Sequence, residues 1–144
     1  MIDYIFWFPI IWVLSFVCHE YMHCFEHMRQ GGHSYKVELW SWHGLPSMRV
    51  YLSGVQRNPA MVYLAGGLYT SVIHLFVLML WVLLYGFQQN GFVYSIVCIG
   101  LVQFFYGYFE REYINMDDRN QYMLGHYILY GVVISVFSVV WLLL

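Results

Sequence analysis

Apolar residues occur along this 144-residue chain in four long runs, which cover residues 4–25, 61–85, 92–109 and 122–144. A helix needs about 20 consecutive apolar residues to cross a hydrocarbon layer ~30 Å thick, and each run approaches or exceeds that length. The pattern therefore predicts an all-α integral membrane protein with four transmembrane helices. Between the second and third runs, the short polar segment 86–91 predicts a tight connection between antiparallel neighbours.

The connection between the first and second runs predicts a small β-structure. Residues 35–40 and 48–52 are β-prone, and a segment with glycine and proline separates them, which is typical of two strands joined by a turn. We expect a β-hairpin insert between Tyr35 and Leu52. An extended peptide can add as a further strand to an open sheet edge, so this hairpin is a candidate substrate-binding surface.

Positive charges in the short connections predict the orientation of the helices. The first connection holds Arg29, Lys36, Arg49 and Arg57, the third holds Arg111 and Arg119, and the second holds none. Short loops rich in Lys and Arg stay on the cytoplasmic side of a membrane. We therefore expect the first and third connections in the cytoplasm and both chain termini on the opposite side.

Composition agrees with a lipid bilayer as the main surroundings of the chain. Hydrophobic residues make up 61% and charged residues 10%, whereas soluble domains carry about 25% charged residues. The net charge of −2 and the absence of a basic stripe argue against a nucleic-acid partner. No linker divides the chain, so residues 1–144 are expected to form one domain, whose oligomeric state the sequence leaves open.

Candidate chemistry lies near the end of the first run, in the HExxH pattern His19-Glu20-Tyr21-Met22-His23. Side chains at positions i and i+4 share a helix face, so two imidazoles there can bind one Zn²⁺ ion. Glu20 is suited to act as general base on a water held by that ion. An ionisable side chain within a span costs ~2.5 kcal/mol or more, which favours a functional role over a chance occurrence of this short pattern.

A catalytic zinc needs a third protein ligand and keeps a fourth position open for water. Asp117 and Asp118 precede the fourth run on the same predicted side of the membrane as the histidines, so either could complete the site. The same pair could instead form a solvated helix start with Asp as N-cap. Glu26 and His27 extend the motif's helix face by a turn and are expected as interfacial polar residues, and His74 as a hydrogen-bonded core histidine.

The HExxH motif, the β-prone insert and residues 63–71 (Tyr-Leu-Ala-Gly-Gly-Leu-Tyr-Thr-Ser) together resemble the site-2 protease family of intramembrane zinc metalloproteases. The resemblance covers most of the chain. The family's small-residue motif implies Gly66, Gly67 and Ser71 as positions that let helices approach closely.

The resemblance further implies Asp118 as the third zinc ligand and Asn115 as a substrate-orienting amide. The chain departs from the family pattern in that Arg119 stands where glycine is expected and Asn115 lies closer to the acid than usual. Asp117 therefore stays as the alternative ligand.

The expected activity is that of a zinc-dependent metalloendopeptidase, which cuts membrane-embedded or membrane-tethered proteins or peptides at an active site toward the cytoplasmic side. One alternative is a membrane metal oxidoreductase of the di-iron hydroxylase type, whose ligands would include His19, His23, His27 and His33. The remaining histidines form no HxxxH or HxxHH cluster, which disfavours it. Another alternative is a non-catalytic membrane binding protein in which the metal only locks helices together.

Overall fold

The computed structural model describes residues 2–42, 45–54, 57–112 and 119–143. These residues form four helices and one two-stranded antiparallel sheet, in the order α1 (Ile2–Arg29), β1 (Ser34–Trp42), β2 (Leu45–Ser53), α2 (Pro59–Tyr85), α3 (Gly91–Glu112) and α4 (Arg119–Leu143). The predicted order of a helix, a hairpin and three further helices is confirmed. Helices α1 and α3 continue about a turn beyond the predicted runs, because a helix can extend past its apolar part into polar residues.

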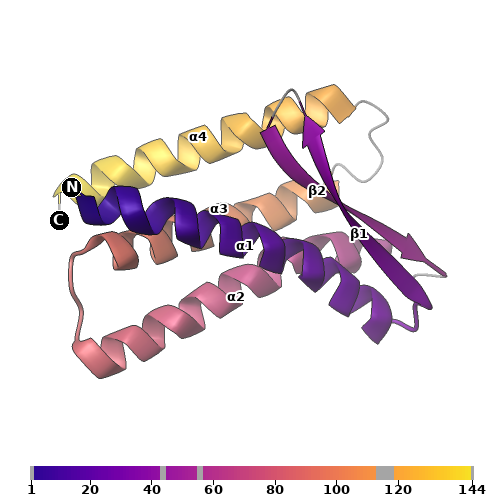
Figure 1. Cartoon of the computed structure of the whole chain (residues 1–144), viewed down its shortest axis with the longest axis horizontal. Helices are drawn as coiled ribbons and strands as arrows, with labels where there is room; N and C mark the ends of the chain where they lie inside the picture. The colour runs from indigo at the N-terminus through magenta and orange to yellow at the C-terminus, as the bar shows by residue number, and fades with distance from the viewer. Residues whose placement is uncertain (1, 43–44, 55–56, 113–118, 144) are drawn as a thin grey trace.

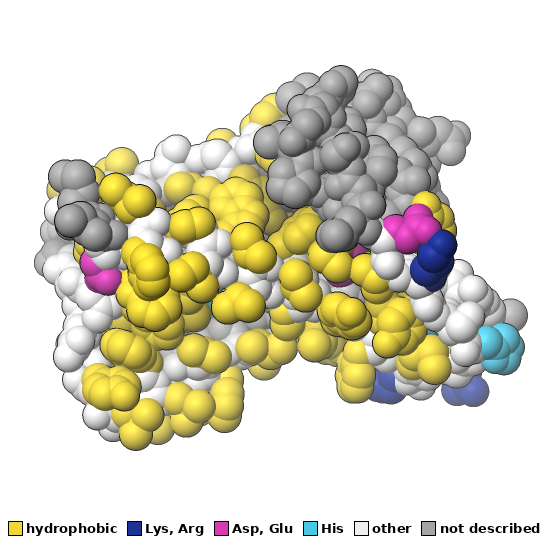
Figure 2. Space-filling view, in the orientation of Figure 1, with side chains coloured by type: hydrophobic (Ala, Val, Ile, Leu, Met, Phe, Trp, Pro, Cys, Tyr) yellow, Lys and Arg dark blue, Asp and Glu magenta, His cyan; other side chains and the backbone are white. Residues whose placement is uncertain are grey.

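Three helices, α1, α2 and α3, are long and apolar enough to cross a membrane. The apolar stretch of α4, Tyr127–Leu143, is shorter than the other three, so a fourth span is not established. Hydrophobic side chains cover much of the surface over the helices, whereas the visible charged groups lie toward the two ends (Figure 2). So large an exposed apolar surface suggests a membrane protein.

The helices run up and down, so that α1 begins and α4 ends at the same end of the bundle (Figure 1). At this end the indole nitrogen of Trp141 donates a hydrogen bond of 3.3 Å to the Tyr4 hydroxyl. Farther along, the rings of Trp12 and Tyr130 stack with centroids 5.0 Å apart, so α4 also contacts α1 in the middle of the bundle.

Small residues let α2 lie close to both α1 and α3. A Cβ at Gly67 would collide with the α3 backbone at Gln103 and Gly107, and a Cβ at Gly66 would collide with the imidazole rings of His19 and His23. The predicted packing role of Gly66 and Gly67 is thus confirmed. The hydroxyl of half-buried Ser71 instead donates a hydrogen bond of 2.7 Å to a carbonyl of its own helix.

The hairpin lies at the end of the bundle where α1 ends (Figure 1). Its strands pair from Ser34 opposite Ser53 to Trp42 opposite Leu45. The Ser53 carbonyl accepts hydrogen bonds from the His33 amide at 3.1 Å and from His27 Nε2 at 2.9 Å. These two bonds fix the base of the hairpin to the last turn of α1.

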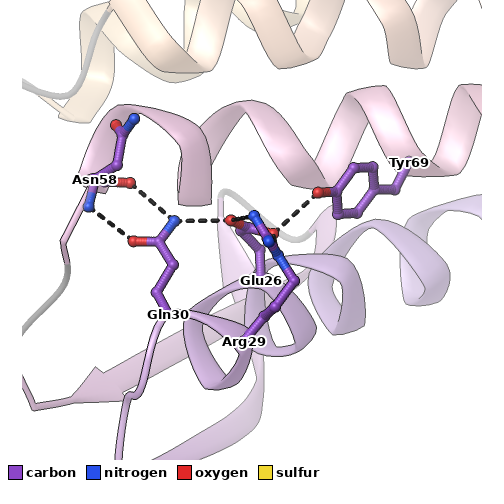
Figure 3. Close-up of polar contacts among 5 residues, drawn as sticks. All are labelled: Glu26, Arg29, Gln30, Asn58 and Tyr69. Atoms are coloured by element: carbon purple, nitrogen blue, oxygen red, sulfur yellow. Dashed lines mark hydrogen bonds and ion pairs between the residues drawn. The ribbon is translucent and has the colours of Figure 1, made fainter.

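A buried carboxylate joins the end of α1 to α2 (Figure 3). Glu26 accepts hydrogen bonds of 2.7 and 2.8 Å from Arg29, of 2.8 Å from Gln30 and of 2.9 Å from the Tyr69 hydroxyl. Gln30 in turn accepts a bond of 2.8 Å from the Asn58 amide, just before α2. This group, which we call the Glu26 network, fixes α1 against α2 about one turn beyond His23.

Candidate metal centre

Three side chains from two helices converge inside the bundle. His19 and His23 lie on successive turns of α1, and Glu110 lies in the last turn of α3. The two Nε2 atoms are 3.0 Å apart, and Glu110 Oε2 lies 3.1 Å from His19 Nε2 and 3.2 Å from His23 Nε2. These residues form a group that could hold a metal ion.

The spacing of the three atoms fits a tetrahedral ion. Zinc bound at ~2.0–2.1 Å in tetrahedral geometry separates its ligand atoms by about 3.3 Å. The triangle of 3.0, 3.1 and 3.2 Å is close to that value. Two histidines, one carboxylate and a free fourth position also match the ligand chemistry of catalytic zinc sites.

Hydrogen bonds to the outer ring nitrogens select the tautomer of both imidazoles. His19 Nδ1 lies 2.8 Å from Gln103 Oε1, and His23 Nδ1 lies 2.7 Å from the Val62 carbonyl oxygen. Because carbonyl oxygens only accept, each Nδ1 must carry the proton. In the neutral rings both Nε2 lone pairs therefore face the Glu110 carboxylate, and a cation between these groups removes their mutual repulsion.

The centre is enclosed by three helices. His19 is 1% and His23 5% exposed, while the Glu110 side chain is 14% exposed. Gly66 of α2 packs against both imidazoles, and the Tyr106 ring of α3 lies 4.9 Å from the His19 ring. The two imidazoles are therefore largely shielded from solvent, and Glu110 is the most exposed of the three side chains.

Glu20 lies beside the centre. It follows His19 in α1, is half-buried, and interacts electrostatically with His19, His23 and Glu110. The Tyr130 ring of α4 lies 6.0 Å from the Tyr106 ring, which packs against His19, so α4 borders the same region. The second carboxylate is thus placed near the centre without belonging to the group of three.

The structure brings together the two predicted histidines, and it adds Glu110, which sequence reasoning missed. The third apolar run ends at residue 109, one position before this glutamate, while α3 continues to Glu112. The available signal was an acidic residue directly after an apolar run. Asp117, Asp118 and Asn115 lie outside the described residues, so their predicted roles stay predictions.

The other candidate side chains have partners of their own. Glu26 belongs to the network of Figure 3, and His27 donates to the Ser53 carbonyl. His74 donates from Nδ1 to the Thr70 carbonyl at 2.7 Å, and its Nε2 lies 2.7 Å from the Ser15 hydroxyl. The prediction of a hydrogen-bonded core histidine at position 74 is confirmed.

Comparison of the chain with protein-family models, with curated proteins and with solved structures finds no match.

Proposed function

We propose that this chain is an intramembrane zinc-dependent metalloendopeptidase that hydrolyses peptide bonds of membrane-embedded or membrane-tethered substrates. One observation carries the proposal: two imidazole nitrogens and a carboxylate oxygen lie 3.0 to 3.2 Å apart within a bundle of apolar helices, with Glu20 beside them. The resemblance of the HExxH motif and of the Gly66-Gly67 segment to the site-2 protease family supports the same activity.

Glu110 is the third ligand in this proposal. Its carboxylate lies within 3.2 Å of both Nε2 atoms, a distance that suits a shared ion. It comes from α3, so the ion would join α1 to α3. The prediction of Asp118, or Asp117, as the third ligand is the competing assignment.

The residues divide the work of hydrolysis. A zinc ion bound here would acidify a water molecule and polarise a peptide carbonyl. His19, His23 and Glu110 would hold the ion, and Glu20 would accept a proton from the water molecule as the water oxygen bonds to the carbonyl carbon. Glu20 then delivers this proton to the amine nitrogen as the C–N bond breaks.

The depth of the centre supports a substrate within or beside the bilayer. His23 lies six residues before Arg29 at the end of α1, about 9 Å along a helix. The four basic residues of the first connection and Arg111 lie toward this end of the chain's helices. By the charge rule for short loops, this end faces the cytoplasm, and α4 completes a four-span arrangement.

The hairpin is the proposed substrate-binding surface. Within the part of the chain that the structure describes, the sheet has two strands, so an extended peptide could add as a third strand at an outer edge. The bonds from His27 and His33 to Ser53 keep this edge at the end of α1 that carries the centre.

Zinc content and peptide cleavage test the proposal in the full chain, purified in detergent micelles. We expect His19→Ala, His23→Ala and Glu110→Ala to lose zinc, while Asp117→Ala and Asp118→Ala retain it. If an aspartate variant loses zinc and Glu110→Ala retains it, that aspartate and not Glu110 is the third zinc ligand.

Cleavage is measured on synthetic single-span peptides with a helix-breaking residue, by mass spectrometry of the products. Glu20→Gln is expected to keep zinc and to lose at least a hundredfold in turnover, because general base catalysis contributes about 10²–10⁴-fold. A native chain with stoichiometric zinc that cuts none of these peptides would contradict the proposed activity.

A structural metal site is the second candidate function, and the near-complete burial of both imidazoles favours it. In that case zinc would stabilise the chain and Glu20→Gln would have no activity to remove.

Metal analysis also tests the di-iron alternative. Among the described residues, the group that could hold an ion is His19, His23 and Glu110, and His27 bonds to Ser53 instead.

A further inference from the structure

The side chain of Gln103 does not belong to the group of three, yet it contacts that group directly. Its Oε1 accepts a hydrogen bond of 2.8 Å from His19 Nδ1. The residue is 2% exposed and lies in the middle of α3. Burying a primary amide inside an apolar helix costs free energy unless the amide forms hydrogen bonds.

Gln103 and Glu110 approach one imidazole from the same helix. They are seven residues apart, two helical turns, so they share a face of α3. The amide oxygen of Gln103 accepts a hydrogen bond from His19 Nδ1, and the Glu110 carboxylate lies 3.1 Å from His19 Nε2. Both nitrogens of this ring are therefore fixed by α3.

The contact between α2 and α3 holds Gln103 in place. A Cβ at Gly67 would collide with the backbone carbonyl of Gln103, so the two helices touch at this residue. The backbone of Gln103 is consequently fixed against α2, and its buried side chain reaches His19 from that fixed point.

We infer that Gln103 is a positioning residue of the proposed zinc site, which holds His19 in the tautomer that binds metal and does so without adding charge. This inference rests on the proposed function. The carboxylates of Glu110 and Glu20 already balance the two positive charges of a zinc ion. A neutral amide at Nδ1 keeps that balance in a low-dielectric interior, as the Val62 carbonyl does for His23.

The two possible roles of Gln103, helix packing and tuning of the ligand, predict different results for two substitutions. Gln103→Leu removes the acceptor while filling similar space. Gln103→Glu keeps the acceptor and adds a negative charge, which makes His19 a more basic ligand and a bound zinc a weaker acid. A packing role alone would give no such opposed effects.

The experiment measures the zinc dissociation constant by competition with a chelator, and the absorption spectrum of the Co²⁺-substituted protein, in the full chain in detergent. We expect Gln103→Leu to weaken zinc binding about 10–100-fold and to shift the cobalt bands. Gln103→Glu should bind zinc at least as tightly as the native chain, with a lower kcat on the cleaved peptide.

Ser95→Ala is the matched control, because Ser95 is another buried polar residue of α3, and its hydroxyl bonds to the Gly91 carbonyl at 2.6 Å, away from the centre. It should leave zinc affinity within twofold of native. If Gln103→Leu binds zinc as Ser95→Ala does, the inference is wrong. If Gln103→Leu does not fold, weaker zinc binding by Gln103→Glu than by the native chain overturns it.

Failure of the proposed function gives a different result. A native chain that binds zinc and cleaves no peptide would end the peptidase proposal, while the zinc and cobalt measurements would still decide the role of Gln103. A native chain that binds neither zinc nor cobalt would overturn both.

Discussion

Each imidazole of the centre has one nitrogen committed to a carbonyl oxygen and the other turned toward Glu110. At the scale of the residue, this pairing is what makes a ligand out of a buried histidine, because the tautomer decides which lone pair is free. The two imidazole rings also need space beside α2. Gly66 supplies that space, since any side chain there would occupy the volume of the two rings.

Gly66→Ala is therefore expected to weaken zinc binding at least tenfold and to lower the unfolding temperature of the chain. The added Cβ must displace the rings of His19 and His23, which lie on a packed helix and cannot move freely. Gly131→Ala in α4 is the control, because a Cβ there meets no atom within 4 Å. Equal zinc affinity in the two variants would contradict the close packing of α2 on the centre.

At the scale of the element, the last turn of α1 connects the centre to the hairpin and to α2. Glu26 is fully buried and accepts hydrogen bonds from Arg29, Gln30 and Tyr69 at that junction. His27, the next residue, bonds to the end of β2. Glu26 therefore holds the last turn of α1 against α2, while His27 holds the end of β2 against the same turn.

Tyr69→Phe removes one hydrogen bond from the Glu26 network and should destabilise the chain by about 1.5–3 kcal/mol, the range for bonds to charged groups. Because Tyr69 contacts α1 at Glu26, about one turn beyond His23, the zinc affinity should stay near that of the native chain. Thermal unfolding in detergent measures the first effect and chelator competition the second. Tyr85→Phe, at the exposed end of α2, is the control and should leave stability unchanged.

At the scale of the whole molecule, the centre joins α1 to α3, and α2 packs over it through Gly66. An ion bound there would link helices that are far apart in sequence, in addition to the apolar packing around Val102, Tyr106 and Tyr130. A ligand that binds only the folded chain stabilises it in proportion to the logarithm of its concentration.

Removal of zinc with a chelator should therefore lower the unfolding temperature of the native chain, and added zinc should restore it. The expected stabilisation is about 2.7 kcal/mol at a free zinc concentration one hundred times the Kd. His19→Ala should unfold at the same temperature with and without zinc. A native chain insensitive to chelator would show that the centre holds no tightly bound ion.

The apolar part of each helix was predictable, because a segment buried in lipid needs apolar residues. The polar ends of the helices were harder to predict. Runs 61–85 and 92–109 agree closely with α2 and α3. The expected extension of the first helix by a turn through Glu26 and His27 agrees with α1, whereas the last turn of α3, which carries Glu110, lies beyond the predicted run. A count of apolar residues measures the hydrocarbon-spanning part of a helix, whereas backbone hydrogen bonding continues beyond it.

The sequence by itself determined the apolar helices, the hairpin, and the shared face of His19 and His23, because all of these follow from periodicities within a short segment of chain. Only the tertiary structure decided that Gln103 and Glu110 meet His19, across sequence separations of 84 and 91 residues. Helix α3 is held in its place beside α2 by the close approach of Gly67 and Gly107. That contact depends on the backbone packing of two helices, which no local pattern specifies.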